Sequence, residues 1–103
     1  SKSKKRQMEN LDRHEDILIF LEENISKLVK LKLASRATYK AYDQNYINYL
    51  IAESSDDNIR MDMYKEIVEG YYLALRKKLM DAVKGNVKLK QDPVITEYLE
   101  LMK

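Results

Sequence analysis

Apolar residues recur every three or four positions along most of the chain, which is the spacing of one face of an α-helix. The first such seam extends from about Met8 to about Leu33 and is widened by Ile17 and Leu31. Its members follow a heptad-like spacing and are Leu11, His14, Leu18, Leu21, Ile25 and Leu28. The pattern predicts a long first helix with one face packed against the rest of the fold.

Four tyrosines mark the second predicted helix, which follows a capping Ser35 and reaches about Glu53. They lie three, four and three residues apart in one stripe: Tyr39, Tyr42, Tyr46 and Tyr49. A tyrosine ring is apolar and its hydroxyl is polar. The stripe can therefore form bundle core, grip a protein partner, or stack on nucleic-acid bases beside Arg36 and Lys40. Core packing is the first interpretation, and Tyr39 and Tyr42 are the functional candidates.

A third helix is predicted over about 58–84, after a polar turn at 54–57 that can cap it. Gly70 falls inside this helix and predicts a close-packing spot or a mild bend. Gly85 is expected to end the helix in the left-handed conformation. The apolar seam of this helix consists of Met63, Ile67, Tyr71, Leu75 and Leu79.

The end of the chain predicts a short fourth helix from Pro93 to about Met102, with Asp92 as its cap and proline at the first helical position. Two glycines and one proline leave few turns, which favours long helices over a β-rich fold. At 103 residues the chain is expected to form one domain, over 8–103. The predicted fold is all-α, an antiparallel bundle of three main helices plus the short fourth. The basic residues 1–7 are expected to form a flexible arm.

Familiar catalytic and metal-binding motifs are absent from the sequence. There is no cysteine, and His14 is the only histidine, so a typical zinc site has no ligand set. Gly-rich phosphate loops and nucleophile elbows are also missing. We therefore expect no enzyme, no metal or other cofactor, and a structural role for His14. No apolar run approaches the roughly 20 residues of a membrane span, and the lack of cysteine fits a cytoplasmic protein.

The net charge is only +2, but the charges are sorted into blocks. Residues 25–42 carry five bases and no acid, residues 76–90 carry six bases and one acid, and residues 43–58 carry four acids and no base. Up-down-up folding brings the end of the first helix, the start of the second and the end of the third to one pole. We expect this pole to attract phosphates, with an ordinary solvated surface as the alternative. The candidate nucleic-acid contacts are Lys27, Lys30, Lys32, Arg36, Tyr39, Lys40, Tyr42, Arg76, Lys77 and Lys78.

Two segments resemble the core-binding domain of tyrosine recombinases, the family of phage and transposon integrases. The first is Ser-Arg-Ala-Thr-Tyr-Lys-Ala-Tyr at 35–42, which continues to Tyr49-Leu50. The second is Ala-Leu-Arg-Lys-Lys-Leu at 74–79, which continues through Ala82-Val83 to Asp-Pro-Val at 92–94. The span between them is short for the family's additional helix, and the family's catalytic Arg, His and Tyr set is absent. The resemblance implies a helical DNA-binding domain that lacks the catalytic part.

Two functions follow from these features. The leading one is a non-catalytic module that associates with nucleic acid through the basic pole. The alternative is a protein-binding regulator or inhibitor, or a homo-oligomer, that uses the tyrosine stripe or an apolar helix face. No small-molecule substrate and no membrane partner are expected.

Overall fold

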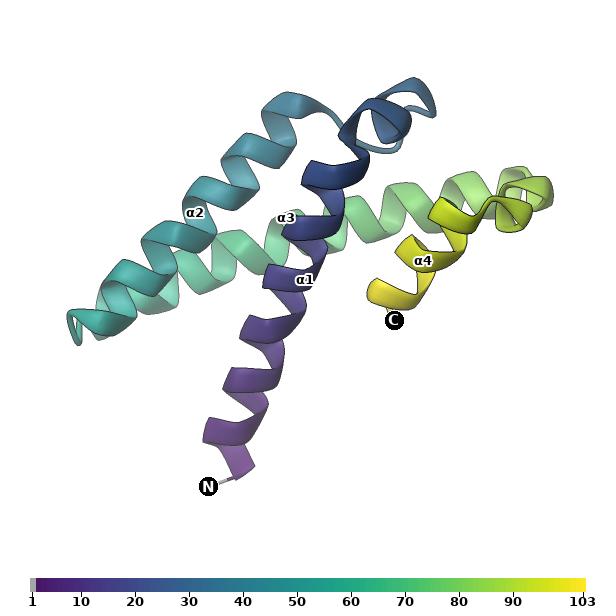
Figure 1. Cartoon of the computed structure of the whole chain (residues 1–103). Coiled ribbons are helices and arrows are strands. Elements are labelled where there is room, and N and C mark those ends of the chain that lie inside the picture. The colour runs from purple at the N-terminus through teal and green to yellow at the C-terminus, as the bar shows by residue number, and fades with distance from the viewer. Residues whose placement is uncertain (1) are drawn as a thin grey trace.

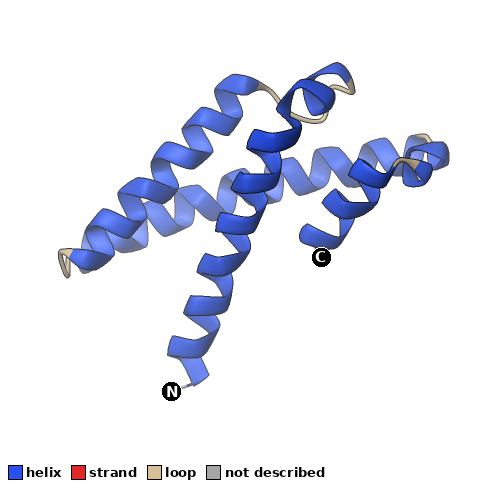
Figure 2. Cartoon of the chain, in the orientation of Figure 1, coloured by secondary structure: helices blue, strands red, loops and turns tan. Residues whose placement is uncertain are grey.

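The computed structural model describes the backbone of residues 2–103 and the side chains of residues 13–103. This part of the chain is built from helices joined by short turns (Figure 1 and Figure 2). The elements, in order, are α1 (Lys2–Lys30), α2 (Arg36–Ser54), α3 (Asn58–Gly85), the 3-10 helix η1 (Val87–Gln91) and α4 (Pro93–Leu101). The predicted all-α class is confirmed. α1 begins ahead of the predicted Met8; the side chains of residues 1–12 lie outside the described ones, and the flexible arm stays a prediction.

The helices form an open bundle around α3. α2 and α3 are antiparallel and joined by a tight turn, α1 crosses in front of α3, and α4 folds back beside α1 (Figure 1). The core lies where α1, α2 and α4 cover one side of α3. Its fully buried side chains come from all four helices and the α1–α2 turn: Ile17, Leu21, Leu28, Leu33, Tyr42, Leu79, Ile95, Tyr98 and Met102.

Local capping signals set three helix starts as predicted. The Ser35 hydroxyl accepts from the Thr38 amide at 3.1 Å, which begins α2. The Asp57 carboxylate accepts from the Arg60 amide at 3.0 Å, which begins α3. Asp92 caps α4 in the same way, with Pro93 in the first helical turn. Such a cap stabilises a helix by about 1 kcal/mol, because it satisfies an amide that has no partner within the helix.

The predicted left-handed end at Gly85 is wrong. Gly85 is the last residue of α3 and has no positive φ. Asn86 follows in extended conformation, and its side chain accepts from the Lys88 amide at 3.2 Å, which starts η1 at once. The left-handed residues are Lys32 (φ 60°) and Asp56 (φ 54°), in the two turns that flank α2.

α1 bends near its C-terminal end, at Asn24, whose φ and ψ are −117° and 15°. The Asn24 side-chain amide donates to the Phe20 carbonyl at 2.9 Å. Beyond the bend, Leu28 is fully buried, but Leu31 is exposed and does not widen the seam as predicted. The helix has ended by then, and Leu33 occupies the core beyond the turn.

The buried face of α3 also differs from the prediction in its first half. Met63 and Ile67 are exposed, whereas Val68 and Tyr72 are buried. Both pairs lie at helical spacing from Leu75, so the periodicity alone does not distinguish the two faces. The observed seam begins at Val68 and reaches the end of α3, and its buried members are Val68, Tyr72, Leu75, Leu79 and Val83.

Candidate functional site

The tyrosine stripe of α2 is mostly core. Tyr42, Tyr46 and Tyr49 are buried, with exposed fractions of 0%, 7% and 5%. The prediction that Tyr42 contacts nucleic acid is wrong, because its ring has no accessible face on which a base can stack. Core packing, the first interpretation of the stripe, is confirmed for these three residues.

Tyr39 is the stripe residue with an accessible ring, and it lies among carboxylates. Its pKa is raised, mainly because the ring is partly buried and to a smaller extent because of the charges of Asp43 and Glu22. It also lines a small groove between α1 and α2 whose floor includes Ile19 and Ile47. An acidic setting of this kind repels phosphates, so Tyr39 is poorly placed for the predicted contact with nucleic acid.

His14 joins three helices through a polar cluster made with Tyr42 and Glu69. The His14 Nδ1 lies 2.5 Å from the Tyr42 hydroxyl, and its Nε2 lies 2.9 Å from Glu69 Oε1. Burial raises the pKa of Tyr42 far above its usual value, so its hydroxyl stays protonated and donates to Nδ1. The Nε2–H then donates to the carboxylate, which defines a neutral imidazole. Burial of His14 lowers its pKa below 6.5, and the opposing effect of Glu69 is smaller.

A second set of hydrogen bonds fixes the end of α4. The carbonyl of Met102 accepts from the Tyr72 hydroxyl at 2.9 Å and from Arg76 Nε at 3.0 Å. Arg13 donates to the same Tyr72 hydroxyl at 3.2 Å and lies over its ring, 5.4 Å from the centroid. Arg76, a predicted phosphate contact, is therefore committed to holding α4.

Lysines gather where the end of α1 meets the start of α4. Lys27 Nζ lies 2.5 Å from Asp92 Oδ2, and this ion pair lowers the pKa of the Asp92 carboxyl. The contact brings the α1–α2 turn to the same side of the molecule as η1 (Figure 1). The exposed bases in these two segments and in the helix ends next to them form what we call the basic end: Lys30, Lys32, Arg36, Lys84, Lys88 and Lys90.

The basic end contains three of the predicted nucleic-acid contacts and three further bases that are not among the predicted contacts. Lys84, Lys88 and Lys90 belong to the basic block at 76–90: Lys84 lies in the last turn of α3, and Lys88 and Lys90 lie in η1. Lys40 is exposed on α2, about one turn beyond Arg36. Farther back on α3, Lys77 pairs with Asp81 at 2.7 Å, and Lys78 is exposed beside it. The predicted contacts thus divide among the basic end with the neighbouring Lys27, the exposed and buried faces of α2, and the second half of α3.

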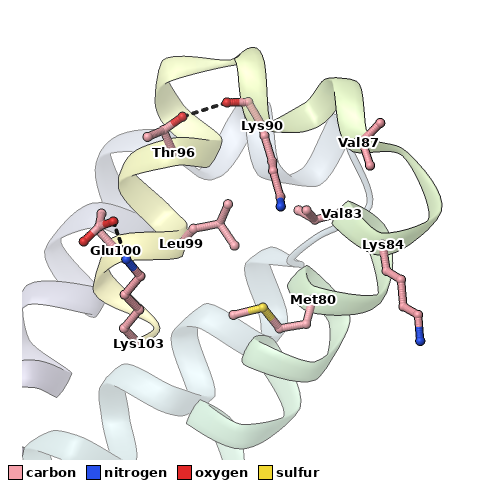
Figure 3. A pocket seen from close by; sticks show the side chains of 9 residues that line it. All are labelled: Met80, Val83, Lys84, Val87, Lys90, Thr96, Leu99, Glu100 and Lys103. Atoms are coloured by element: carbon pink, nitrogen blue, oxygen red, sulfur yellow. Dashed lines mark hydrogen bonds and ion pairs between the residues drawn. The ribbon is translucent and has the colours of Figure 1, made fainter.

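A hollow of about 640 Å³ adjoins the basic end, between α3, η1 and α4 (Figure 3). Its walls are largely apolar, with Met80, Val83 and Leu99 at the centre. The Lys90 side chain reaches across the hollow, and Lys84 points away from it (Figure 3).

Two polar side chains of the lining, Glu100 and Thr96, are already hydrogen-bonded to neighbouring groups. Glu100 accepts from Lys103 Nζ at 2.7 Å, and the Thr96 hydroxyl donates to the Lys90 carbonyl at 2.9 Å. The lining therefore provides cations and apolar walls but no activated nucleophile.

Within residues 13–103, no group of three or more His, Cys, Asp and Glu side chains is arranged to hold a metal ion. None of the helices described is long and apolar enough to cross a membrane. No protein-family model, curated protein or solved structure matches the chain.

Proposed function

We propose that this protein is a non-catalytic module that binds nucleic acid by holding phosphates at its basic end. The observation that carries this proposal is the Lys27–Asp92 ion pair, which joins two base-rich segments. Neither 25–42 nor 82–91 contains an acid, and Asp92 is already paired with Lys27. The basic end therefore presents six exposed positive charges with no carboxylate from those segments to neutralise them.

A surface of this kind binds nucleic acid by releasing counterions condensed on the phosphates. The opposite end of the α2–α3 hairpin carries Glu53, Asp56 and Asp57. These acids repel phosphates, so the charge distribution favours one orientation on the nucleic acid. Of the two segments that resemble the integrase core-binding domain, the first, which begins at Ser35, includes Arg36 of the basic end, and the second, at 74–94, includes Lys84, Lys88 and Lys90. The resemblance thus supports DNA as the nucleic acid.

The test is fluorescence anisotropy with a labelled 20-base-pair DNA duplex, a DNA single strand and an RNA duplex. In the double variant Lys30→Gln/Lys88→Gln, the affinity should fall at least tenfold, because both charges belong to the basic end. The matched control, Arg60→Gln/Lys65→Gln, removes the same charge from the acidic end of the hairpin and should change the affinity less than threefold. Equal losses in the two variants would contradict a localised site.

A second candidate function is the binding of a protein partner in the groove between α1 and α2. The groove is about 230 Å³, and Ile19, Ile47 and Leu50 are exposed within it at 49%, 39% and 40%. Its rim carries Glu15, Glu22 and Asp43, which suits a basic amphipathic helix.

This function is separable from nucleic-acid binding. A Leu/Lys amphipathic peptide should bind the parent protein and the Lys30→Gln/Lys88→Gln variant equally. It should lose affinity for Ile47→Asp. Failure of the peptide to bind the parent protein would remove this candidate.

A further inference from the structure

The side of α3 that faces away from the core carries a row of large apolar side chains that no other described part of the chain covers. Ile59, Met63 and Leu73 have exposed fractions of 86%, 47% and 57%. The buried residues of α3 project from the opposite face, toward α1, α2 and α4, and α1 and α4 pass across that face (Figure 1). We call the uncovered row the outer α3 face, and its residues are Ile59, Met63, Glu66, Ile67, Gly70, Leu73 and Lys77.

Gly70 lies in the middle of the outer α3 face, and no contact within the described part of the chain requires a glycine there. A Cβ atom placed on Gly70 would meet no other atom within 4 Å. The close packing predicted for Gly70 is therefore not found within the described chain. Glycine inside a helix costs about 1 kcal/mol relative to alanine, so this position is destabilising unless another surface packs against it.

Charge along α3 is arranged so that the helix complements itself when reversed. Residues 58–69 carry two bases and three acids, whereas residues 70–85 carry four bases and one acid. On the outer α3 face itself, Glu66 belongs to the first half and Lys77, which pairs with Asp81 of its own helix, to the second, and both are exposed. An antiparallel second copy would place the acidic half of each helix against the basic half of the other.

We propose that the outer α3 face binds the same face of a second copy of this chain, with the two α3 helices antiparallel. A two-fold axis at the midpoint between Gly70 and Leu73 places Leu73 of each copy over Gly70 of the other. Because Glu66 and Lys77 share that midpoint, each Glu66 then lies opposite the Lys77 of the other copy. The missing side chain at Gly70 makes room for the leucine, which explains both the exposed Leu73 and the glycine.

The size of the contact indicates a reversible dimer. A helix the length of α3 extends roughly 42 Å at 1.5 Å per residue, and a helix-wide strip along it buries roughly 400 Å² on each copy. The total of roughly 800 Å² is at the low end for specific protein interfaces, where association is weak. In this arrangement Lys84 lies opposite Ile59 of the other copy, whereas the other five bases of the basic end lie outside α3. The dimer therefore does not depend on nucleic-acid binding.

The proposal is tested by sedimentation equilibrium of the purified chain from about 10 μM to 1 mM. The parent chain should shift from monomer to dimer across this range. Gly70→Gln should weaken the dimer at least tenfold, because the new side chain occupies the place of Leu73. The same substitution should leave the melting temperature of the dilute monomer unchanged or raise it, since the added atoms meet nothing within the chain. That combination separates a lost interface from a damaged fold.

Charge reversal gives a second readout. Glu66→Lys and Lys77→Glu should each weaken the dimer, and the double variant Glu66→Lys/Lys77→Glu should restore it, because the opposing pairs are re-formed with exchanged signs. A parent chain that stays monomeric up to 1 mM would overturn the proposal. It would also be overturned by a Gly70→Gln variant that dimerises like the parent, or by a double variant no tighter than either single one.

Discussion

His14 Nε2 lies 2.9 Å from Glu69 Oε1, in a pair where the imidazole is buried and the carboxylate is partly exposed. Tyr42 occupies the other ring nitrogen, so one side chain of α1 contacts α2 and α3 together. The charges nearest to the ring are Glu69, which favours a protonated imidazole, and Arg13, which opposes one. Burial outweighs the carboxylate, and the folded protein holds the histidine neutral.

The first prediction is that stability falls as the pH drops below about 6.5, the ordinary pKa of histidine. Since the folded state lowers the pKa of His14, the unfolded chain takes up a proton first as the pH falls. The free energy of unfolding should be constant above this value and should decrease below it by up to about 1.4 kcal/mol per pH unit. Urea unfolding at pH 7.5, 6.5 and 5.5 measures this slope. His14→Gln should flatten it, and an equal slope in the variant would contradict the assignment.

The second prediction contrasts two tyrosines that are both fully buried. Tyr42 donates its hydroxyl proton to His14, whereas the Tyr98 hydroxyl has no hydrogen-bond partner among the described residues. Tyr42→Phe should therefore destabilise the fold by about 1–2 kcal/mol, because it leaves a buried ring nitrogen unpaired. Tyr98→Phe should be neutral or stabilising, since it removes a buried polar atom that forms no bond. The melting temperatures of the two variants test this contrast. A larger decrease for Tyr98→Phe than for Tyr42→Phe would contradict it.

The third prediction concerns the carboxylate at the basic end. Asp92→Asn keeps a side-chain oxygen that can cap α4 but removes the charge that pairs with Lys27. The freed lysine adds a cation, so nucleic-acid affinity at low salt should rise and the salt dependence should steepen by about 0.9 in log–log slope. Anisotropy titration of this variant beside the parent chain provides the measurement. If the variant remains folded but binds nucleic acid more weakly, the phosphates do not bind at the basic end.

The fourth prediction concerns the role of Arg76 in holding the end of α4. Its Nε donates to the carbonyl of Met102, and a lysine has no donor at that position. Arg76→Lys should cost about 1 kcal/mol of stability, because the carbonyl loses a partner. Its affinity for nucleic acid should stay within twofold of the parent value, because the charge is kept. Lys78→Gln is the control, with a stability change within about 0.5 kcal/mol, as expected for an exposed side chain.

The features that the sequence predicted well depend on neighbouring residues. Ser35, Asp57 and Asp92 each satisfy amides two or three positions away, so the starts of three helices could be read locally. The same local reasoning failed at Gly85, because Asn86 ends α3 in extended conformation, with its backbone N–H donating to the Ala82 carbonyl, and its side chain caps the start of η1.

Features that depend on distant contacts could not be predicted in this way. The choice between Met63 and Val68 as a core residue depends on which side of α3 the other helices cover. The partners of His14 lie 28 and 55 residues away, and the periodicity of α1 contains no information on them. A lone histidine on an apolar seam does indicate that some partner is needed, since a buried polar ring without one is costly.

The most direct test of nucleic-acid binding at the basic end is the salt dependence of duplex DNA affinity for the parent chain. If about four of the six bases of the basic end contact phosphates, the slope of the logarithm of the binding constant against the logarithm of the salt concentration should be about −3.6 between 50 and 200 mM salt. The variant Lys30→Gln/Lys88→Gln should lower the magnitude of that slope by about 1.8. Absence of binding at 50 mM, or a slope near zero, would contradict the account.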